Sequence, residues 1–365
     1  MAVKCGIVGM PNVGKSTLFN CLSKAKAQSA NFPFCTIEPN VGVITVPDVR
    51  LEKLSELVNP EKVQATTIEI VDIAGLVKGA SKGEGLGNKF LANIRETNAI
   101  IHVLRCFDDD NIVHVDGSVN PVRDKETIDF ELQIKDLEVV EKKRDKYQKI
   151  AKSGDKEAIK IVGILDKYII HLQKGESVRS LEMTDTEKEV IADLYLLTDK
   201  PVLYVCNVDE VSAKDGNKYV EQVREAIKTE DAEILLIATS IEAEIAELED
   251  LEEQNLFLDE MGLEKPGVHY LIQATYRLLN LQTYFTAGEK EVRAWTITKG
   301  MKAPQAAGVI HSDFEKGFIR AEVIAYKNFV ALGSEQACKD SGKLSVEGKQ
   351  YVVQDGDVMH FRFNV

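Results

Sequence analysis

Apolar runs of strand length alternate with amphipathic stretches along much of the chain. The first three are VKCGIVG at residues 3–9, TTIEIVDIAG at 66–75 and AIIHVLRCF at 99–107. Two more follow after a gap, PVLYVCNV at 201–208 and EILLIATS at 233–240. Strands that alternate with helices are typical of a mostly parallel α/β sheet. We predict one such sheet domain, built from residues 1–128 and 200–280.

The strand pattern stops between these two parts. From about residue 124 to 173 the chain holds two charged helical stretches, split by KSGDK around Gly154. Apolar residues of the second stretch recur at spacings of three and four, which predicts a buried seam. This seam is Ala158, Ile161, Leu165, Tyr168 and Leu172, and the looser seam of the first stretch is Phe130, Ile134, Leu137, Val140 and Tyr147. We predict an antiparallel helical hairpin, inserted at 129–199.

The last part of the chain, 281–365, has a different pattern. EVRAWTITKG, GFIRAEVIAY and QYVVQDGDVMHFRFN are strand-like, and the third contains an Asp355-Gly356 turn. APQAAGVI is a short helix candidate, and the helical stretch GVHYLIQATYRLLN precedes the region. These patterns predict a small α+β domain.

Composition narrows the class of protein. The chain of 365 residues has 44% hydrophobic and 28% charged residues, which is ordinary for a soluble globular protein. Its formal net charge of −14 argues against coating nucleic acid through overall basicity, although a local basic patch stays possible. No run approaches the ~20 apolar residues of a membrane span, so we expect a cytoplasmic protein. The six cysteines form no CxxC pair, and we expect reduced thiols without a zinc site.

The strongest motif is GMPNVGKST at 9–17, which fits G-x-x-x-x-G-K-[ST] between a strand and a helix pattern. Backbone N–H groups of such a loop surround phosphate, a lysine meets the β- and γ-oxygens, and a serine ligates Mg²⁺. The alternative is a glycine-rich turn without a ligand. The predicted phosphate-binding residues are Asn12, Val13, Gly14, Lys15, Ser16 and Thr17.

A second motif supports a nucleotide switch. Asp72 ends an apolar strand and Gly75 follows three residues later, so that Asp72 would hold the Mg²⁺ water shell and the Gly75 amide would sense a γ-phosphate. Thr36 lies in a turn-rich segment and its hydroxyl would reach Mg²⁺ beside Ser16. D-x-x-G is also common in ordinary turns, and a loop threonine is usually only solvated.

The hydrolysis step lacks its usual residue. Leu76 stands where many switch GTPases have a glutamine that orients the attacking water. His114, in a polar loop after the third strand, is the candidate replacement. From the residues alone, an exposed loop histidine without a role is the competing interpretation.

The base-recognition segment follows the strand at 201–208. Guanine-specific switches carry Asn-Lys-x-Asp there, and this chain has Asn207, Val208, Asp209 and Glu210. An asparagine amide pairs with the N6/N7 edge of adenine but also donates to guanine N7. A glutamate keeps the charge that accepts from guanine N1 and N2, so the residues alone leave GTP open.

Together these motifs resemble the YchF/Obg-like ATPase family nearly end to end. The most specific segments are NFPFCTIEPN, VDIAGLVKGASKGEGLGN, LNLQTYFTAG, HSDFEKGFIRAE and DGDVMHFRFNV. The resemblance implies a Ras-like P-loop NTPase domain, the inserted hairpin and a β-grasp-like TGS domain. It also implies ribosome binding, through the large subunit or the 70S particle.

The same resemblance assigns roles to single residues. It implies that His114 contributes to hydrolysis and that N-x-x-E at Asn207 to Glu210 goes with a preference for ATP over GTP. The backbone at Val208 and the loop around Ser240 would contact the base. Asn12 resembles an asparagine with which related switches coordinate K⁺, while a turn-favouring asparagine is the alternative.

A basic run at the predicted hairpin tip is the candidate RNA surface. A solvated helix face is its ordinary explanation, and docking on ribosomal RNA is the functional one. The run contains Lys142, Lys143, Arg144, Lys146, Lys149, Lys152 and Lys156. We expect a monomer that acts as a slow ATPase switch on the ribosome. A nucleotide-gated binding module with negligible hydrolysis, a GTPase and, less well supported, a small-molecule kinase are the alternatives.

Overall fold

The computed structural model describes residues 3–29, 41–73, 86–248 and 250–364. They form two compact units. The larger unit comprises Val3–Val43 and Glu69–Ala274, and the smaller comprises Ile44–Ile68 and Thr275–Val365. Every described residue of the predicted nucleotide site belongs to the larger unit.

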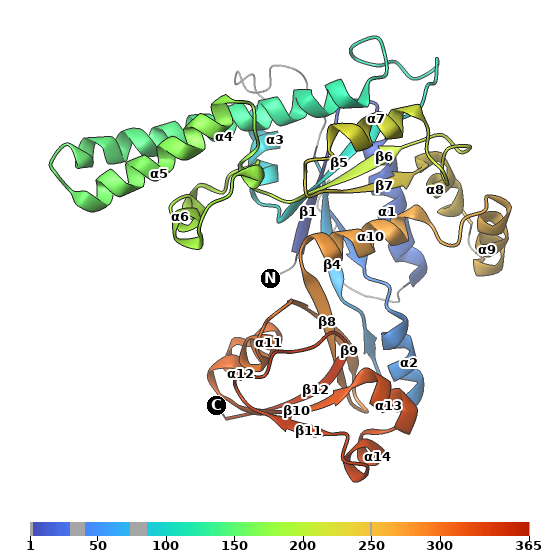
Figure 1. Cartoon of the computed structure of the whole chain (residues 1–365). Coiled ribbons are helices and arrows are strands. Elements are labelled where there is room, and N and C mark those ends of the chain that lie inside the picture. The colour runs from blue at the N-terminus through green and yellow to red at the C-terminus, as the bar shows by residue number, and fades with distance from the viewer. Residues whose placement is uncertain (1–2, 30–40, 74–85, 249, 365) are drawn as a thin grey trace. The chain divides into compact units, whose positions relative to one another are not determined.

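A six-stranded sheet in the order β2-β4-β1-β5-β6-β7 is the framework of the larger unit (Figure 1). Its strands are β1 (Val3–Val8), β2 (Val41–Thr45), β4 (Thr67–Asp72), β5 (Ala99–Arg105), β6 (Val202–Asn207) and β7 (Glu233–Ile237). The pairs β1–β5, β5–β6 and β6–β7 are parallel. All residues of β5 and β6 are buried, as their unbroken apolar runs predict.

The register of this sheet brings separate motifs to one edge. Val8 pairs with His102, and Arg105 pairs with Asn207, so β1, β5 and β6 end on the same side. The carboxyl edge of a parallel sheet is where α/β proteins bind ligands. The phosphate loop after β1, the loop after β5 and the base-recognition segment after β6 all begin there.

Helices pack on this sheet and extend from it. They are α1 (Lys15–Ser29), α3 (Leu86–Arg95), α4 (Pro121–Ala151), α5 (Lys156–Gln173), α6 (Asp185–Glu189), α7 (Lys218–Ala226), α8 (Thr239–Ile245), α9 (Leu251–Glu260) and α10 (Gly267–Leu278). Short 3₁₀ turns lie at Val178–Ser180 and Ala192–Leu194.

The predicted hairpin is the antiparallel pair α4 and α5, the long arm in Figure 1. Asn120 caps α4 by accepting from the Arg123 N–H at 3.0 Å, and Asp155 caps α5 by accepting from the Ala158 N–H at 2.8 Å. Between the helices Gly154 has a φ of 86°, a left-handed conformation that glycine adopts without strain.

The hairpin core confirms the predicted seam of α5, with one correction on α4. Ala158, Leu165, Tyr168 and Leu172 are buried, and the chain at 178–196 folds back onto them. Phe130, in contrast, is 59% exposed. Helix α4 packs on β5 and α7 as well as on α5, and Phe130 is not part of the apolar cluster between α4 and α5. A seam predicted for a two-helix contact alone therefore does not hold at Phe130.

The smaller unit is a mixed sheet in the order β11-β10-β12-β8-β9-β3. Its strands are β3 (Val63–Gln64), β8 (Leu281–Ala287), β9 (Val292–Thr298), β10 (Phe318–Ala325), β11 (Ser345–Glu347) and β12 (Asp357–Phe363). Its helices are α2 (Val49–Val58), α11 (Ala303–Ile310), α12 (Ser312–Lys316), α13 (Tyr326–Leu332) and α14 (Glu335–Asp340).

Two apolar clusters hold this sheet. One joins β10 and β12 to α11, and the other joins β8 and β9 to α2 and α13. Because α2 and β3 come from 44–68, the unit combines segments that are distant in sequence. The predicted fold class is confirmed, while the predicted boundaries at 128, 199 and 280 stay a prediction.

Candidate functional site

The turn between β1 and α1 depends on left-handed backbone positions. Asn12 has a φ of 62° and Gly14 a φ of 99°. A Cβ on Gly14 would lie 2.3 Å from Nδ2 of Asn207, so a side chain at this position is excluded. Helix α1 starts at Lys15, and the Leu18 N–H donates to the Gly14 carbonyl at 2.9 Å. The free N–H groups of the first helical turn therefore lie at this loop, where they attract anions.

Lys15 is buried within the loop. Its Nζ donates to the Met10 carbonyl at 2.6 Å. Burial lowers the pKa of the Lys15 ammonium to about 8, and the nearby Asp72 carboxylate partly opposes this shift. A buried cation without a full counter-charge is stabilised by an incoming anion, which is what a phosphate supplies.

Ser16 and Asp72 are the described part of the predicted Mg²⁺ site. The Ser16 hydroxyl donates to Oδ2 of Asp72 at 3.2 Å. Oδ1 of Asp72 is buried and has no hydrogen-bond partner among the described residues. A hydroxyl beside a carboxylate with an unused oxygen matches the oxygen donors that Mg²⁺ prefers. The other residues predicted here, Thr36 and Gly75 together with Leu76, lie outside the described residues.

Asn207 lies at the end of β6, and its side chain connects two loops. Its side chain is buried, with Nδ2 donating to the Val13 carbonyl at 2.9 Å. Its Oδ1 accepts from the Thr239 N–H at 3.1 Å. The amide thereby links the phosphate loop to the start of α8. Each of the two atoms retains capacity for one further hydrogen bond.

The other residues predicted to contact the base follow Asn207 or Thr239 in the sequence. Val208 is buried, and its N–H donates to the Ile237 carbonyl at 3.1 Å. Glu210 and Ser240 are exposed, Glu210 in the loop that follows Asn207 and Ser240 next to Thr239 at the start of α8. Thr17 is exposed on the first turn of α1. The described structure thus collects the phosphate and base motifs at one edge of the sheet.

The loop between β5 and α4 contacts the phosphate loop. Nδ2 of Asn12 donates to the Val113 carbonyl at 3.1 Å. The buried Arg105 guanidinium shapes the preceding part of this loop by donating to the carbonyls of Phe107, Asp109 and Ile112 at 3.2, 3.0 and 2.8 Å. The backbone next to His114 therefore lies beside the phosphate site.

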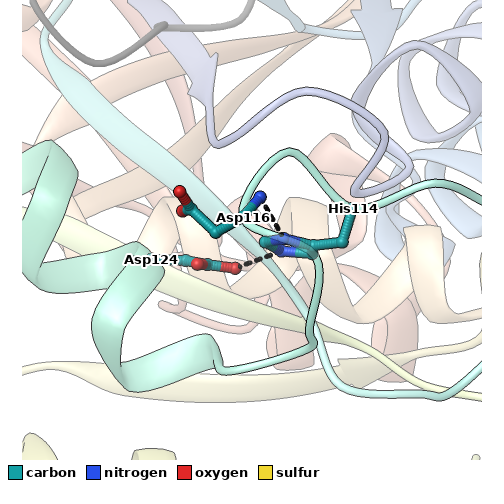
Figure 2. A group of neighbouring side chains, drawn as sticks. All are labelled: His114, Asp116 and Asp124. Carbon is teal, nitrogen blue, oxygen red and sulfur yellow. Dashed lines mark hydrogen bonds and ion pairs between the residues drawn. The ribbon is translucent and has the colours of Figure 1, made fainter.

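The imidazole of His114 itself is engaged elsewhere (Figure 2). Its Nδ1 accepts from the Asp116 N–H at 3.1 Å, and its Nε2 lies 2.9 Å from Oδ2 of Asp124. The His114 side chain is only 4% exposed. The backbone of the predicted hydrolytic residue thus lies near the phosphate loop. Both nitrogens of its ring, however, already have hydrogen-bond partners.

His114, Asp116 and Asp124 have the donor types of a metal site, with ligand atoms within 4.8 Å of one another. One guanidinium already pairs with both carboxylates. Arg123 lies 3.0 Å from Oδ1 of Asp124 and 3.6 Å from Oδ2 of Asp116. Since Nδ1 of His114 also accepts from a backbone N–H, we interpret the group as a hydrogen-bonded cluster rather than a metal centre.

The sequence interpretation missed Arg105, Asp124 and Thr239. Arg105 ends a fully buried strand, a position where a charged residue is rare unless it is paired. Asp124 follows the N-cap and Pro121 in a first helical turn, where an acidic residue ordinarily interacts only with the helix N-terminus. Neither position has a spacing that marks it as functional.

Within the part of the chain that the structure describes, no helix has the length and apolarity to cross a membrane.

Comparison with known proteins gives full-length matches. Residues 4–143 match the family model described as 50S ribosome-binding GTPase, and residues 281–364 match the YchF-GTPase C-terminal model, described as of unknown function. The chain is 56% identical to "Ribosome-binding ATPase YchF" of Bacillus subtilis (strain 168) and 58% identical to the protein of that name from Haemophilus ducreyi. Both matches cover 100% of each chain. The solved structure of the Schizosaccharomyces pombe YchF GTPase is similar with a TM-score of 0.89 and 39% identity, over 99% of this chain and 97% of that one.

Proposed function

The chain belongs to the YchF family, and on this premise we propose that it is a ribosome-binding ATPase that prefers ATP over GTP. The observation that carries the proposal is full-length identity of more than half to relatives named for this activity. The phosphate loop, with its buried Lys15 and the Ser16–Asp72 pair, supplies the matching chemistry. We also propose that the protein is cytoplasmic and acts as a monomer.

In this proposal the phosphates of ATP lie on the loop formed by Asn12, Val13, Gly14, Lys15, Ser16 and Thr17. Lys15 contacts the β- and γ-oxygens. Because these oxygens are negatively charged, they favour the protonated form of Lys15 and oppose the lowering of its pKa by burial. Ser16, Asp72 and Thr36 would hold Mg²⁺, and the Gly75 amide would respond to the γ-phosphate. Bound Mg²⁺ neutralises phosphate charge and fixes the orientation of the triphosphate.

Asn12 is proposed to ligate K⁺ through its Oδ1. Its Nδ2 is already used by the Val113 carbonyl at 3.1 Å, which leaves the oxygen available. One side chain would then connect a cation beside the phosphates to the loop that carries His114. A cation there supplies positive charge to the transition state, as an arginine finger does elsewhere.

For the base, we propose that Asn207, Val208, Glu210 and Ser240 contact adenine. The names of the relatives differ on this point, since the two bacterial proteins are named ATPases and the fission yeast protein is named a GTPase. Val208 and Glu210 are the two differences from the guanine motif Asn-Lys-x-Asp. Asn207 holds two backbone partners and has capacity for one further hydrogen bond at each atom, so we propose that discrimination also depends on the surrounding backbone and on Glu210.

Ribosome binding is proposed to use the hairpin tip. Lys142, Lys146, Lys149, Lys152 and Lys156 are exposed on α4, the turn and α5. Lys143 and Arg144 have intramolecular partners instead, because Lys143 donates to the Val190 carbonyl at 2.6 Å and Arg144 to Asp166 at 3.0 Å. An exposed lysine group of this kind fits the phosphates of ribosomal RNA.

A second candidate is a nucleotide-gated binding module with negligible hydrolysis. One observation favours it: both ring nitrogens of His114 are occupied in this structure. Single-turnover hydrolysis separates the two, because the module binds ATP and releases it unchanged.

The phosphate site is tested by Lys15→Ala. We expect loss of ATP binding or of turnover, because the substitution removes the cation that faces the β- and γ-oxygens. The measurement is a titration with a fluorescent ATP analogue together with phosphate release. Lys142→Ala, on the hairpin, is the matched control and should keep both properties. Wild-type affinity and turnover in Lys15→Ala would remove the phosphate-site assignment.

A further inference from the structure

We propose that Asp124 is a positioning residue that holds His114 in a withdrawn state, so that hydrolysis requires the release of the imidazole from Asp124. The inference rests on the proposed role of His114 in hydrolysis. It adds a residue and a step to that role.

The hydrogen bonds fix the tautomer of His114. Nδ1 lies 3.1 Å from the Asp116 backbone nitrogen, which can only donate, so Nδ1 accepts. The proton of the neutral ring then lies on Nε2, which is 2.9 Å from Oδ2 of Asp124 and donates to it. With both nitrogens used and the side chain 4% exposed, the ring cannot orient a water at the γ-phosphate from this position.

Asp124 is itself held in place. Arg123 donates to its Oδ1 from Nε at 3.2 Å and from Nη2 at 3.0 Å. The carboxylate is 1% exposed and lies in the first turn of α4, where the helix N-terminus stabilises negative charge. Asp124 therefore cannot follow His114 toward the phosphates, and the contact between them must break for the imidazole to move.

The loop is built so that this movement stays local. Arg105 donates to the carbonyls of Phe107, Asp109 and Ile112, and Asn12 donates to the carbonyl of Val113. Beyond His114, Gly117 has a φ of 73° and nothing lies within 4 Å of where its Cβ would be. Within 114–118 the Gly117 N–H donates to the His114 carbonyl at 3.0 Å, and Arg123 donates to the Ser118 carbonyl at 2.7 Å. Release of the imidazole therefore requires 114–118 to rearrange between a fixed point at the phosphate loop and the start of α4.

Release of His114 leaves a buried carboxylate with one charge-assisted hydrogen bond fewer. A bond of this kind contributes about 1.5 kcal/mol or more, which corresponds to roughly a tenfold lower population of the released ring. Weakening the contact should raise that population by the same factor. If release limits the reaction, the hydrolysis rate rises with it.

The test is single-turnover ATP hydrolysis by Asp124→Asn in the full-length protein. The amide keeps the size of the carboxylate and an acceptor oxygen but removes its charge. We expect hydrolysis to be faster than wild type, by roughly tenfold if the whole charge-assisted bond is lost. Glu126→Gln is the matched control, because it removes an exposed carboxylate from the same turn of α4, and it should keep the wild-type rate.

The effect must depend on His114. In a His114→Ala background, Asp124→Asn should change nothing. A rate that is unchanged or lower in Asp124→Asn, while His114→Ala alone slows hydrolysis, overturns the positioning inference and leaves the function proposal standing. If His114→Ala alone hydrolyses ATP at the wild-type rate, the proposed role of His114 fails instead, and the inference with it.

A spectroscopic measurement on the wild-type protein covers the case in which Asp124→Asn does not fold. Long-range ¹H–¹⁵N correlation of the imidazole nitrogens reports the tautomer directly. Without nucleotide we expect the Nε2-protonated form of His114, and its signals should shift when Mg²⁺ and a non-hydrolysable ATP analogue are added. The Nδ1-protonated form in the nucleotide-free protein would overturn the inference.

Discussion

Lys15 holds its proton less firmly than an exposed lysine does. Burial lowers its pKa to about 8, so the nucleotide-free protein loses this positive charge as the pH rises through that value. Phosphate oxygens beside the ammonium favour the charged form, and ATP binding above about pH 8 must therefore take up a proton.

This linkage predicts that ATP affinity falls as the pH rises above about 8, by at most about tenfold per pH unit. Isothermal titration in buffers of different ionisation enthalpy measures both the affinity and the proton uptake. Lys142→Ala should reproduce the wild-type profile, since that lysine is exposed on the hairpin. An affinity without pH dependence, measured without proton uptake from about pH 7 to 9.5, would contradict the assignment of Lys15.

We expect a substitution of Asn207 to affect the structure of the two connected loops more than the choice between ATP and GTP. Asn207→Asp keeps the acceptor for the Thr239 N–H but replaces the donor to the Val13 carbonyl with an oxygen. We expect ATP and GTP affinity to fall together and the free energy of unfolding to decrease by about 1–3 kcal/mol, because a buried carbonyl loses its partner.

Paired nucleotide titrations and urea unfolding test this expectation. Glu210→Gln is the comparison variant, since Glu210 is exposed, and it should change the ratio of ATP to GTP affinity with little effect on stability. A selective loss of ATP affinity in Asn207→Asp, at unchanged stability, would show that Asn207 reads the base directly.

Single residues were predictable from sequence where a motif fixes their geometry. Gly14, Lys15, Ser16 and Asp72 come together as the phosphate-loop spacing implies. The partners of Asn207 were not predictable, because they come from other loops: Thr239 lies 32 residues beyond Asn207. Those of His114 come from its own loop and from the first turn of α4, at spacings that no motif marks. A spacing pattern carries no information on which backbone group a buried amide or imidazole will meet.

At the scale of elements, the basic residues of the hairpin fall into two groups. Some have partners within the hairpin region, and the others are exposed and available to a partner. Lys142, Lys146 and Lys149 are exposed at spacings of four and three on α4, hence on one side of the helix. Lys143 and Arg144 bind Val190 and Asp166 within the arm. A test of RNA contact should leave these two unchanged.

We predict that reversing Lys142, Lys146 and Lys149 to Glu weakens ribosome co-sedimentation and leaves ATP affinity unchanged. Each lost phosphate contact should also reduce the slope of log affinity against log salt by about 0.7–0.9. The charge-matched control reverses Lys214, Lys228 and Lys265, exposed lysines of the larger unit outside the hairpin. Equal salt slopes for the two triple variants would exclude the hairpin tip as the RNA surface.

Element types followed well from periodicity, and their packing less well. The strands β1, β4, β5, β6 and β7 and the seam of α5 lie where apolar periods predict them. Phe130 does not, because α4 contacts β5 and α7 as well as α5, and one helical period cannot encode several partners. The segment 44–68 joins the smaller unit through β3 and α2, and a two-residue strand such as β3 leaves no signal in the sequence.

At the scale of the whole molecule, the fold narrows the function without choosing the nucleotide. A P-loop sheet with an inserted hairpin and a C-terminal mixed sheet is compatible with both names that relatives carry, ATPase and GTPase. We propose that the choice depends on the few groups around Asn207 and Glu210. We also propose that hydrolysis depends on whether His114 leaves Asp124.

The central claim is therefore tested most directly by one assay: turnover of ATP and GTP by the wild-type protein, side by side, with and without purified ribosomes. We predict that ATP is hydrolysed in both conditions and in preference to GTP, and that Lys15→Ala lacks this activity. Preferential turnover of GTP, or no turnover of either nucleotide even with ribosomes present, would contradict the account.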